Sequence, residues 1–156
     1  MPRFPQVTGR NLEGRELAFP NDFEGDVACA IVAFRQEHQR LVDTWLPHLA
    51  QLAKAEPRLS YYELPAIGGR WKLARPFIDG GMARAITDLG TRERTVTVYG
   101  QVDELVESLE LANTDTIAVV LVARSGTIVW QASGGCTDAL AAELESALAS
   151  HLANVQ

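Results

Sequence analysis

The chain has 156 residues, 47% of them hydrophobic and 22% charged, so we expect a single domain over residues 1–156 that buries its own core. Its 14 basic and 20 acidic residues give a net charge of -6, which opposes binding to phosphate backbones and predicts no nucleic-acid partner. No apolar run reaches the roughly 20 residues that cross a membrane, and no apolar signal segment follows Met1, so we expect a cytoplasmic protein without a membrane span.

The first 25 residues predict a β-hairpin extension. Gly9 and Gly14 act as turn signals between short extended pieces, and a Pro-Asn-Asp sequence at 20–22 closes the hairpin. The next run, 27–34, is continuously apolar and of strand length. This pattern is typical of a central strand that helices cover on both faces.

An amphipathic helix is predicted over 37–55, because four large apolar residues recur at helical spacing. These residues are Leu41, Trp45, Leu49 and Leu52. Pro47 lies inside the pattern. It removes one backbone hydrogen bond and clashes with the preceding turn, so we expect a kinked helix.

The middle of the chain predicts a second core strand and an interrupted helical stretch. Residues 59–64 are rich in β-formers, and we expect the strand to stop at Pro65. The stretch 71–89 has apolar residues at helical spacing, but Pro76 and the glycines at 80–81 divide it into two pieces.

The second half of the chain predicts a strand at 95–99, a short helix at 102–109, a strand at 117–123 and a final helix at 137–152. Ser125 and Gly126 join the strand at 117–123 to a further strand at 127–131 as a hairpin. The order is therefore strand, helix, strand, helix, strand, helix, hairpin and helix after the N-terminal extension.

This order resembles that of thioredoxin-like and peroxiredoxin-like proteins over nearly the whole chain. The resemblance rests on the segment 32–35, the helix with Pro47, and the late run 121–130. It implies an α/β thioredoxin-like fold, with a central mixed β-sheet flanked by helices. Phe34-Arg35 with Trp45, together with the run 126–134, is most similar to the mitochondrial ATP synthase assembly-factor family.

The resemblance also places the redox motif of these proteins on residues that are not cysteines. Its two cysteines would fall on Gln39 and Val42, and neither side chain can form a thiolate. Its cis-proline would fall near Thr116 or Ile117, where this chain has no proline. Two losses in one site imply a redox-inactive domain.

The cysteines and histidines predict neither a metal site nor a cofactor. Cys29 and Cys136 lie far apart, without the paired spacing of a zinc site or a disulfide framework. His38, His48 and His151 have no ligand spacing to one another or to the cysteines. We therefore expect two free thiols, with Cys29 buried in its strand.

A candidate binding surface follows from the position where thioredoxins work. It comprises Arg35, Gln36, Glu37, His38, Gln39, Trp71 and Thr116. A helix N-terminus with an imidazole can bind an anion or relay a proton, with Glu37 and His38 as an acid–base pair. The alternative is a solvated first turn, because adjacent helical residues point in different directions. Trp45 and Trp130 are expected in the core, whereas Trp71 follows two glycines and is a candidate partner contact.

Cys136 is the one catalytic candidate. It follows two glycines and precedes a predicted helix, where the helix dipole and free N–H groups stabilise a thiolate. The alternative interpretation is a small residue in the first turn, with Thr137 or Asp138 as the helix cap.

Two hypotheses of function remain open on this basis. The first is a redox-inactive domain that binds a protein partner, as a chaperone-like assembly helper if the assembly-factor resemblance holds. The second is a thiol-dependent peroxidase or oxidoreductase that uses Cys136. A homodimer, formed through an edge strand or through the Arg35–Gln39 surface, is a further hypothesis.

Overall fold

The computed structural model describes residues 2–67 and 89–154. Its strands are β1 (Val7–Asn11), β2 (Glu16–Phe19), β3 (Val27–Ala33), β4 (Leu59–Ile67), β5 (Val96–Tyr99), β6 (Ala118–Ala123) and β7 (Ile128–Ser133). Its helices are the 3-10 turn η1 (Gln36–His38), α1 (Gln39–Ala55), α3 (Leu89–Arg94), α4 (Val102–Ser108) and α5 (Asp138–Asn154). The predicted stretch 71–89, with Trp71, lies outside the described residues except for its last position.

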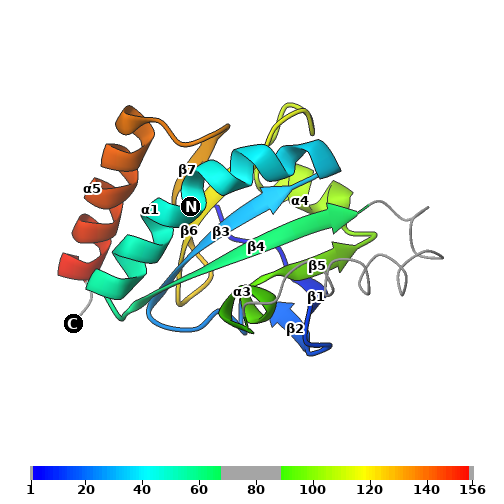
Figure 1. Ribbon diagram of the computed structural model, residues 1–156, viewed down its shortest axis with the longest axis horizontal. Helices are drawn as coiled ribbons and strands as arrows, with labels where there is room; N and C mark the ends of the chain where they lie inside the picture. Colours follow the sequence, from blue (N-terminus) through cyan, green and yellow to red (C-terminus); the bar gives the residue numbers. More distant parts are fainter. Residues whose placement is uncertain (1, 68–88, 155–156) are drawn as a thin grey trace.

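The described strands form one mixed sheet in the order β2-β1-β5-β4-β3-β6-β7 (Figure 1). β3, β4 and β5 are parallel to one another, β6 is antiparallel to β3, and β7 is antiparallel to β6. The predicted central mixed sheet is therefore confirmed. The hairpin of β1 and β2 joins it through antiparallel pairing of β1 with β5, so the predicted extension forms one edge of the sheet.

β3 separates two apolar layers. All seven of its residues are buried. Val27, Cys29 and Ile31 pack on one face with α1 and α5. The intervening alanines and Val32 pack on the other face with the hairpin and Leu105 of α4. Side chains of a strand alternate between the two faces of its sheet, so a continuous apolar run is what a doubly covered strand requires.

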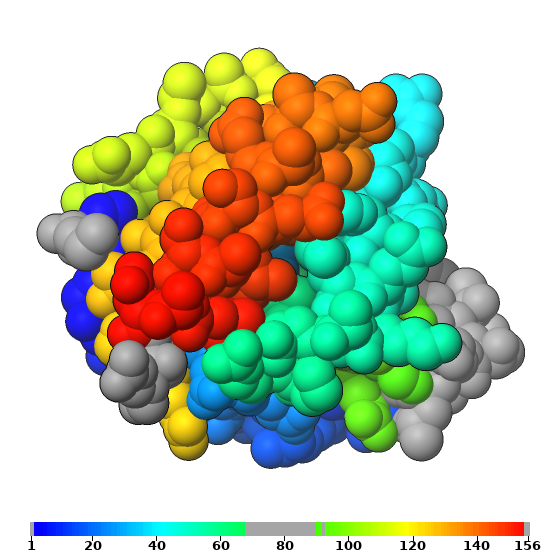
Figure 2. Space-filling model, turned by 90° about the vertical axis from the view of Figure 1, so that its left-hand side faces the viewer, coloured from blue at the N-terminus to red at the C-terminus, as the bar shows by residue number. Residues whose placement is uncertain are grey.

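Helices α1 and α5 lie side by side on the same face of the sheet, as Figures 1 and 2 show. Of the four apolar residues predicted for α1, Trp45 and Leu49 are buried and Leu41 and Leu52 are half-buried, and Val42 is buried beside them. Pro47 lies within this helix, and the ribbon bends part-way along it (Figure 1). In α5 the leucines at 144, 148 and 152 are buried. Among the described helices, none is both long and apolar enough to cross a lipid bilayer.

The predicted end of a strand at Pro65 was wrong, because β4 continues to Ile67. Proline lacks an N–H donor and is normally excluded from central strands. Here Pro65 pairs with Ala33 of β3, and the regular ladder from β4 to β5 begins one residue later, at Ala66. Residues 65 and 67 direct their backbone groups toward β5, so the missing N–H of Pro65 leaves the ladder with β3 intact.

Gly9 is not a turn residue, in contrast to its predicted role. It lies in the middle of β1, opposite Val98 of β5. A Cβ atom at this position would lie 2.5 Å from the Thr97 carbonyl oxygen and 2.8 Å from Val96 Cγ1. Only glycine therefore allows the hairpin to approach β5 this closely.

We predict that Gly9→Ala destabilises the protein by about 1–3 kcal/mol, because the added methyl group must displace the backbone of β5. Urea unfolding followed by tryptophan fluorescence measures this change. Thr8→Ala, at an exposed neighbour on the same strand, is the control, with a change within about 0.5 kcal/mol. Equal effects of the two substitutions would contradict the packing argument.

Candidate functional site

Three loops meet at the N-terminal end of α1. The segment 34–39 leads from β3 through η1 into the helix, the segment 113–117 precedes β6, and the segment 133–137 joins β7 to α5. The parallel and antiparallel pairing of β3 with its neighbours brings these ends together. Hydrogen bonds then fix the loops to α1 and to one another.

His38 joins the first two of these loops. Its ring is buried, with 3% exposure. Nδ1 accepts a hydrogen bond from the Phe34 N–H at 3.1 Å, and Nε2 lies 3.1 Å from the Asp115 carbonyl oxygen. Because Nδ1 is an acceptor, the ring proton belongs on Nε2, which donates to Asp115. His38 thus satisfies a backbone donor and a backbone acceptor in two segments far apart in sequence.

Arg35, on the outside of this junction, contacts the same loop. Its Nη2 lies 2.8 Å from Asp115 Oδ1, and its Nη1 lies 3.7 Å from Glu37 Oε1. All three side chains are largely exposed, so each ion pair contributes about 1 kcal/mol or less. Gln36 is exposed as well. Arg35, Glu37 and Asp115 therefore expose one cation and two carboxylates at this junction.

The third loop packs against the first two turns of α1. Trp45 Nε1 donates to the Gly134 carbonyl oxygen at 3.0 Å, and the Cys136 N–H donates to Thr44 Oγ1 at 2.8 Å. The Gly134 N–H donates to the Ile117 carbonyl oxygen at 3.1 Å, which ties this loop to the segment of Thr116. Thr116 is half-buried beside Gly134.

The Cys136 side chain is half-buried and packs against the apolar layer between α1, α5 and the sheet. Thr137 Oγ1, not Cys136, caps α5 by accepting the Leu140 N–H at 3.1 Å. Burial, reinforced by the nearby Asp138 carboxylate, raises the pKa of the Cys136 thiol. Burial raises the pKa of Cys29 to about 12. Neither thiol has the depressed pKa of a reactive cysteine.

Gln39, the first residue of α1, covers a buried carboxyl group. Its Nε2 donates to Asp43 Oδ1 at 2.9 Å and to Glu63 Oε1 at 3.2 Å. Glu63 belongs to β4 and is only 8% exposed. Val42, one turn along the helix, is 2% exposed and packs in the core. The resemblance assigns redox cysteines to these two positions. One of them therefore holds an amide that bonds to Glu63, and the other holds a core side chain.

The surroundings of Glu63 favour its neutral form. Burial raises the pKa of the Glu63 carboxyl, and the Asp43 carboxylate adds to this effect, whereas hydrogen bonds from Gln39 and Thr95 and the charge of Arg94 oppose it. Thr95 Oγ1 donates to the Thr91 carbonyl oxygen at 2.8 Å and lies 3.3 Å from Glu63 Oε2. When Glu63 is protonated, Oε2–H can donate to Thr95, so every polar atom in the chain of contacts has a partner.

Glu63 and Asp115 were not predicted from the sequence. A glutamate on the same face as Leu59 and Tyr61, inside a predicted core strand, was the available signal for Glu63, because a buried carboxyl needs partners. Asp115 has no comparable signal, since only the fold brings its loop against His38. Of the predicted surface, Arg35, Gln36, Glu37, Gln39 and Thr116 lie around the junction, His38 is buried within it, and Trp71 is outside the described residues.

We predict that His38→Ala destabilises the protein by about 2–5 kcal/mol, because it leaves the Phe34 N–H and the Asp115 carbonyl without their partner and opens a cavity. Urea unfolding measures the change. The neighbouring exposed substitution Glu37→Ala is the control and should shift the free energy of unfolding by about 0.5 kcal/mol or less. A His38→Ala variant as stable as Glu37→Ala would show that the bridge contributes nothing.

A pH profile tests the state of Glu63. Below the ordinary glutamate pKa of 4.5, folded and unfolded chains both hold the proton, and the stabilising contribution is complete. As pH rises toward the raised folded pKa, the folded state binds more protons than the unfolded state, so this contribution is lost at up to about 1.4 kcal/mol per pH unit. Glu63→Gln keeps the neutral hydrogen bonds and removes the titration.

We therefore expect the stability of Glu63→Gln, relative to the unmodified protein, to increase as pH rises from about 4 to about 8. Urea midpoints and slopes at each pH give the two free energies, and the difference between them removes the effects of all other titrating groups. A difference that is independent of pH would mean that Glu63 titrates alike in the folded and unfolded chains.

No protein-family model matches this chain, and no curated protein matches it. Solved structures do. BsSco, a member of the Sco family of cytochrome c oxidase assembly proteins, is 14% identical over 94% of this chain and 93% of its own, with a TM-score of 0.62. The thioredoxin domain of a thiol-disulfide oxidoreductase from Bacteroides vulgatus is 21% identical over 92% and 94%, with a TM-score of 0.57.

An exposed lipoprotein thioredoxin from Streptococcus pneumoniae is 12% identical over 90% of this chain and 98% of its own, with a TM-score of 0.58. These likenesses span almost the whole of each chain, although the sequences have diverged far. Together with the order of the sheet, they show that this chain has the thioredoxin-like fold.

Proposed function

We propose that this chain is a redox-inactive thioredoxin-like domain that binds a protein partner through the surface around the first turn of α1. The hydrogen bonds of Gln39 carry this proposal. The position that would hold a nucleophile instead holds an amide, which bonds to Asp43 and to the buried Glu63. An amide in this arrangement holds the helix start in place and has no thiol chemistry.

The surface has the properties of a binding site on a rigid support. Arg35, Glu37 and Asp115 present charges outward, and the buried His38 bonds hold their backbone in place. A rigid surface loses little conformational entropy when a partner binds, so its charges can select that partner. The proposed partner is a protein that presents complementary charges to this surface.

An assembly role is the finer form of the proposal. BsSco shares the fold and is a member of a family of cytochrome c oxidase assembly proteins. By analogy, this chain would act in the cytoplasm as a chaperone-like helper of another protein. The alternative, a peroxidase or oxidoreductase that uses Cys136, gains no support from the raised pKa of that thiol or from the Asp138 carboxylate beside it.

Turnover assays test the redox part of the proposal. We expect the purified protein neither to accelerate the reduction of insulin disulfides by dithiothreitol nor to consume peroxide, and Cys136→Ser to behave identically. Gln39→Cys/Val42→Cys is the matched positive control, because it places two thiols on the same scaffold. Turnover of about 1 s⁻¹ or faster that Cys136→Ser abolishes would instead establish the enzyme.

Site-specific photocrosslinking in the native host tests the binding part of the proposal. A benzoylphenylalanine probe replaces the exposed Gln36 at the proposed surface or the exposed Ser146 on α5. We expect a discrete protein adduct from position 36 only, and we expect Arg35→Glu to weaken that adduct. Identical adducts from both positions, or none from position 36, would contradict a partner site at this surface.

A further inference from the structure

The first half of β4 has a strand on one side only. β3 pairs with β4 from Leu59 to Pro65. On the other side, β5 pairs with Ala66 and Ile67, and a single bridge joins Glu63 to Thr95. The residues immediately before Thr95 form α3, so β5 does not extend alongside the first half of β4. Within the described residues, the side of 59–62 that faces away from β3 therefore has no neighbouring strand.

The backbone groups on this open edge follow from the alternation of a strand. The Gly100 N–H donates to the Ile67 carbonyl oxygen at 2.8 Å, so Ile67 directs its polar groups toward β5. Alternate residues of a strand direct their N–H and C=O groups to the same side. Tyr61 therefore directs both groups to the open edge, whereas Ser60 and Tyr62 direct theirs to β3. Leu59 also faces outward, but its N–H donates to the Glu56 carbonyl oxygen.

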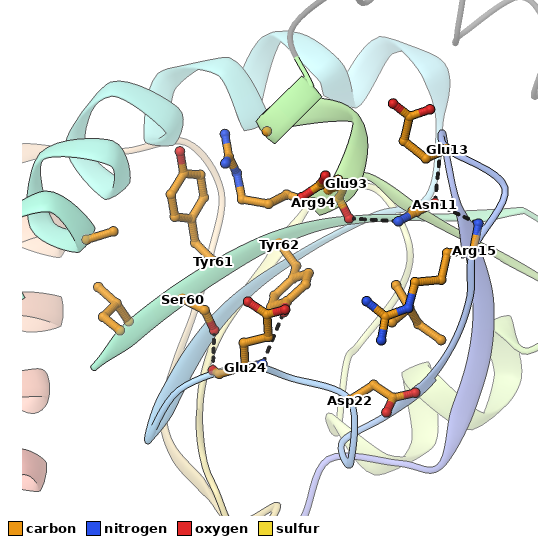
Figure 3. A pocket seen from close by; sticks show the side chains of 14 residues that line it. Asn11, Glu13, Arg15, Asp22, Glu24, Ser60, Tyr61, Tyr62, Glu93 and Arg94 are labelled. Atoms are coloured by element: carbon orange, nitrogen blue, oxygen red, sulfur yellow. Dashed lines mark hydrogen bonds between the residues drawn. The ribbon is translucent and has the colours of Figure 1, made fainter. Parts of the chain in front are cut away.

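A cleft of about 420 Å³ lies beside this edge. Its walls come from β4, the turn between β1 and β2, the segment before β3, and α3 (Figure 3). Four acidic residues and two arginines line it. They are Glu13, Asp22, Glu24, Glu93, Arg15 and Arg94. The lining is therefore acidic, and a basic ligand complements it.

Hydrogen bonds and ring contacts hold the walls of the cleft in place. The Glu24 N–H donates to the Tyr62 hydroxyl at 3.1 Å, and Ser60 Oγ donates to the Glu24 carbonyl oxygen at 2.6 Å. The Arg94 guanidinium lies 4.4 Å from the centre of the Tyr61 ring. The Glu24 carboxylate has no ion-pair partner among the described residues, so it is available to a ligand.

We propose that this cleft binds an extended, basic segment of a protein partner, which runs antiparallel to β4 and pairs with the backbone N–H and C=O of Tyr61 as a short added strand. The side chain opposite Tyr61 would lie along its ring and be apolar. The two flanking side chains would point to the face of Ser60 and Tyr62, toward Asp22 and Glu24, and be basic. Three consecutive residues of the bound segment would therefore be basic, apolar and basic.

This site is separate from the surface at the first turn of α1. Tyr61 pairs with Cys29 in the first half of β3, whereas that surface begins after β3 ends at Ala33. The proposal therefore does not depend on the function proposed above, and it offers a second contact for the same partner or a contact for another one.

Amide exchange in the free protein tests the geometry of the edge. We expect the Tyr61 N–H to exchange with solvent faster than the Tyr62 and Leu64 N–H groups, which direct their bonds to β3. Tyr61 protection equal to that of Tyr62 would mean that the edge is already occupied, and it would overturn the proposal.

A peptide titration tests the ligand. The probe is acetyl-Lys-Val-Lys-amide, followed by two-dimensional NMR of the labelled protein. At a concentration about ten times its Kd, we expect exchange at Tyr61 to slow about tenfold, with shift changes at Tyr61 and Glu24.

Three matched controls accompany the titration. N-methylation of the peptide valine removes the donor to the Tyr61 carbonyl, acetyl-Glu-Val-Glu-amide reverses the charge, and Glu24→Gln removes a carboxylate without touching the backbone bonds of that residue. Each should weaken binding at least about threefold, whereas Glu104→Gln, at an exposed position on α4, should leave it unchanged. Absence of binding by the basic peptide, or equal binding of both peptides, would overturn the proposal.

Discussion

The arrangement of the molecule depends on the complete burial of β3. A strand without an exposed residue needs an apolar layer on each face, and the chain supplies α1 with α5 on one face and α4 with the hairpin on the other. Since β3 ends at Ala33 and α1 begins six residues later, the start of the helix must lie at the edge of the sheet. The candidate surface is therefore positioned by the core.

Buried polar groups stabilise this surface. His38 is the hydrogen-bond partner of one backbone N–H and one backbone C=O from two loops. The Glu63 carboxyl accepts a hydrogen bond from Gln39 Nε2. In a medium of low dielectric constant, each of these groups is costly unless paired, so together they tolerate few alternative loop arrangements. Rigidity at the helix start is a property of a binding surface as much as of a catalytic one. In the proposed function, the exposed Arg35 and Glu37 side chains select the partner.

Much of the fold could be predicted from the sequence, because hydrophobic periodicity reports burial directly. The runs around β3 and β6 and the leucines of α5 are examples. Pro65 and Gly9 led to wrong predictions, because proline and glycine usually indicate a strand end or a turn in the local sequence. Their positions here are set instead by Ala33 and Val98, which come from distant segments. His38 was assigned to the surface for the same reason: its burial depends on Asp115, which lies 77 residues away. No short window of sequence contains that contact.

We infer that the Gln39 amide, bonded to the buried Glu63 carboxyl, occupies the position of the thiol nucleophile at the first turn of α1. The carbon-13 shift of the Glu63 carboxyl, followed against pH together with the side-chain amide of Gln39, tests it most directly. We expect Glu63 to lose its proton above its ordinary pKa, and the Gln39 amide to shift with the same midpoint. Titration of Glu63 at its ordinary value, with an unresponsive Gln39, would contradict it.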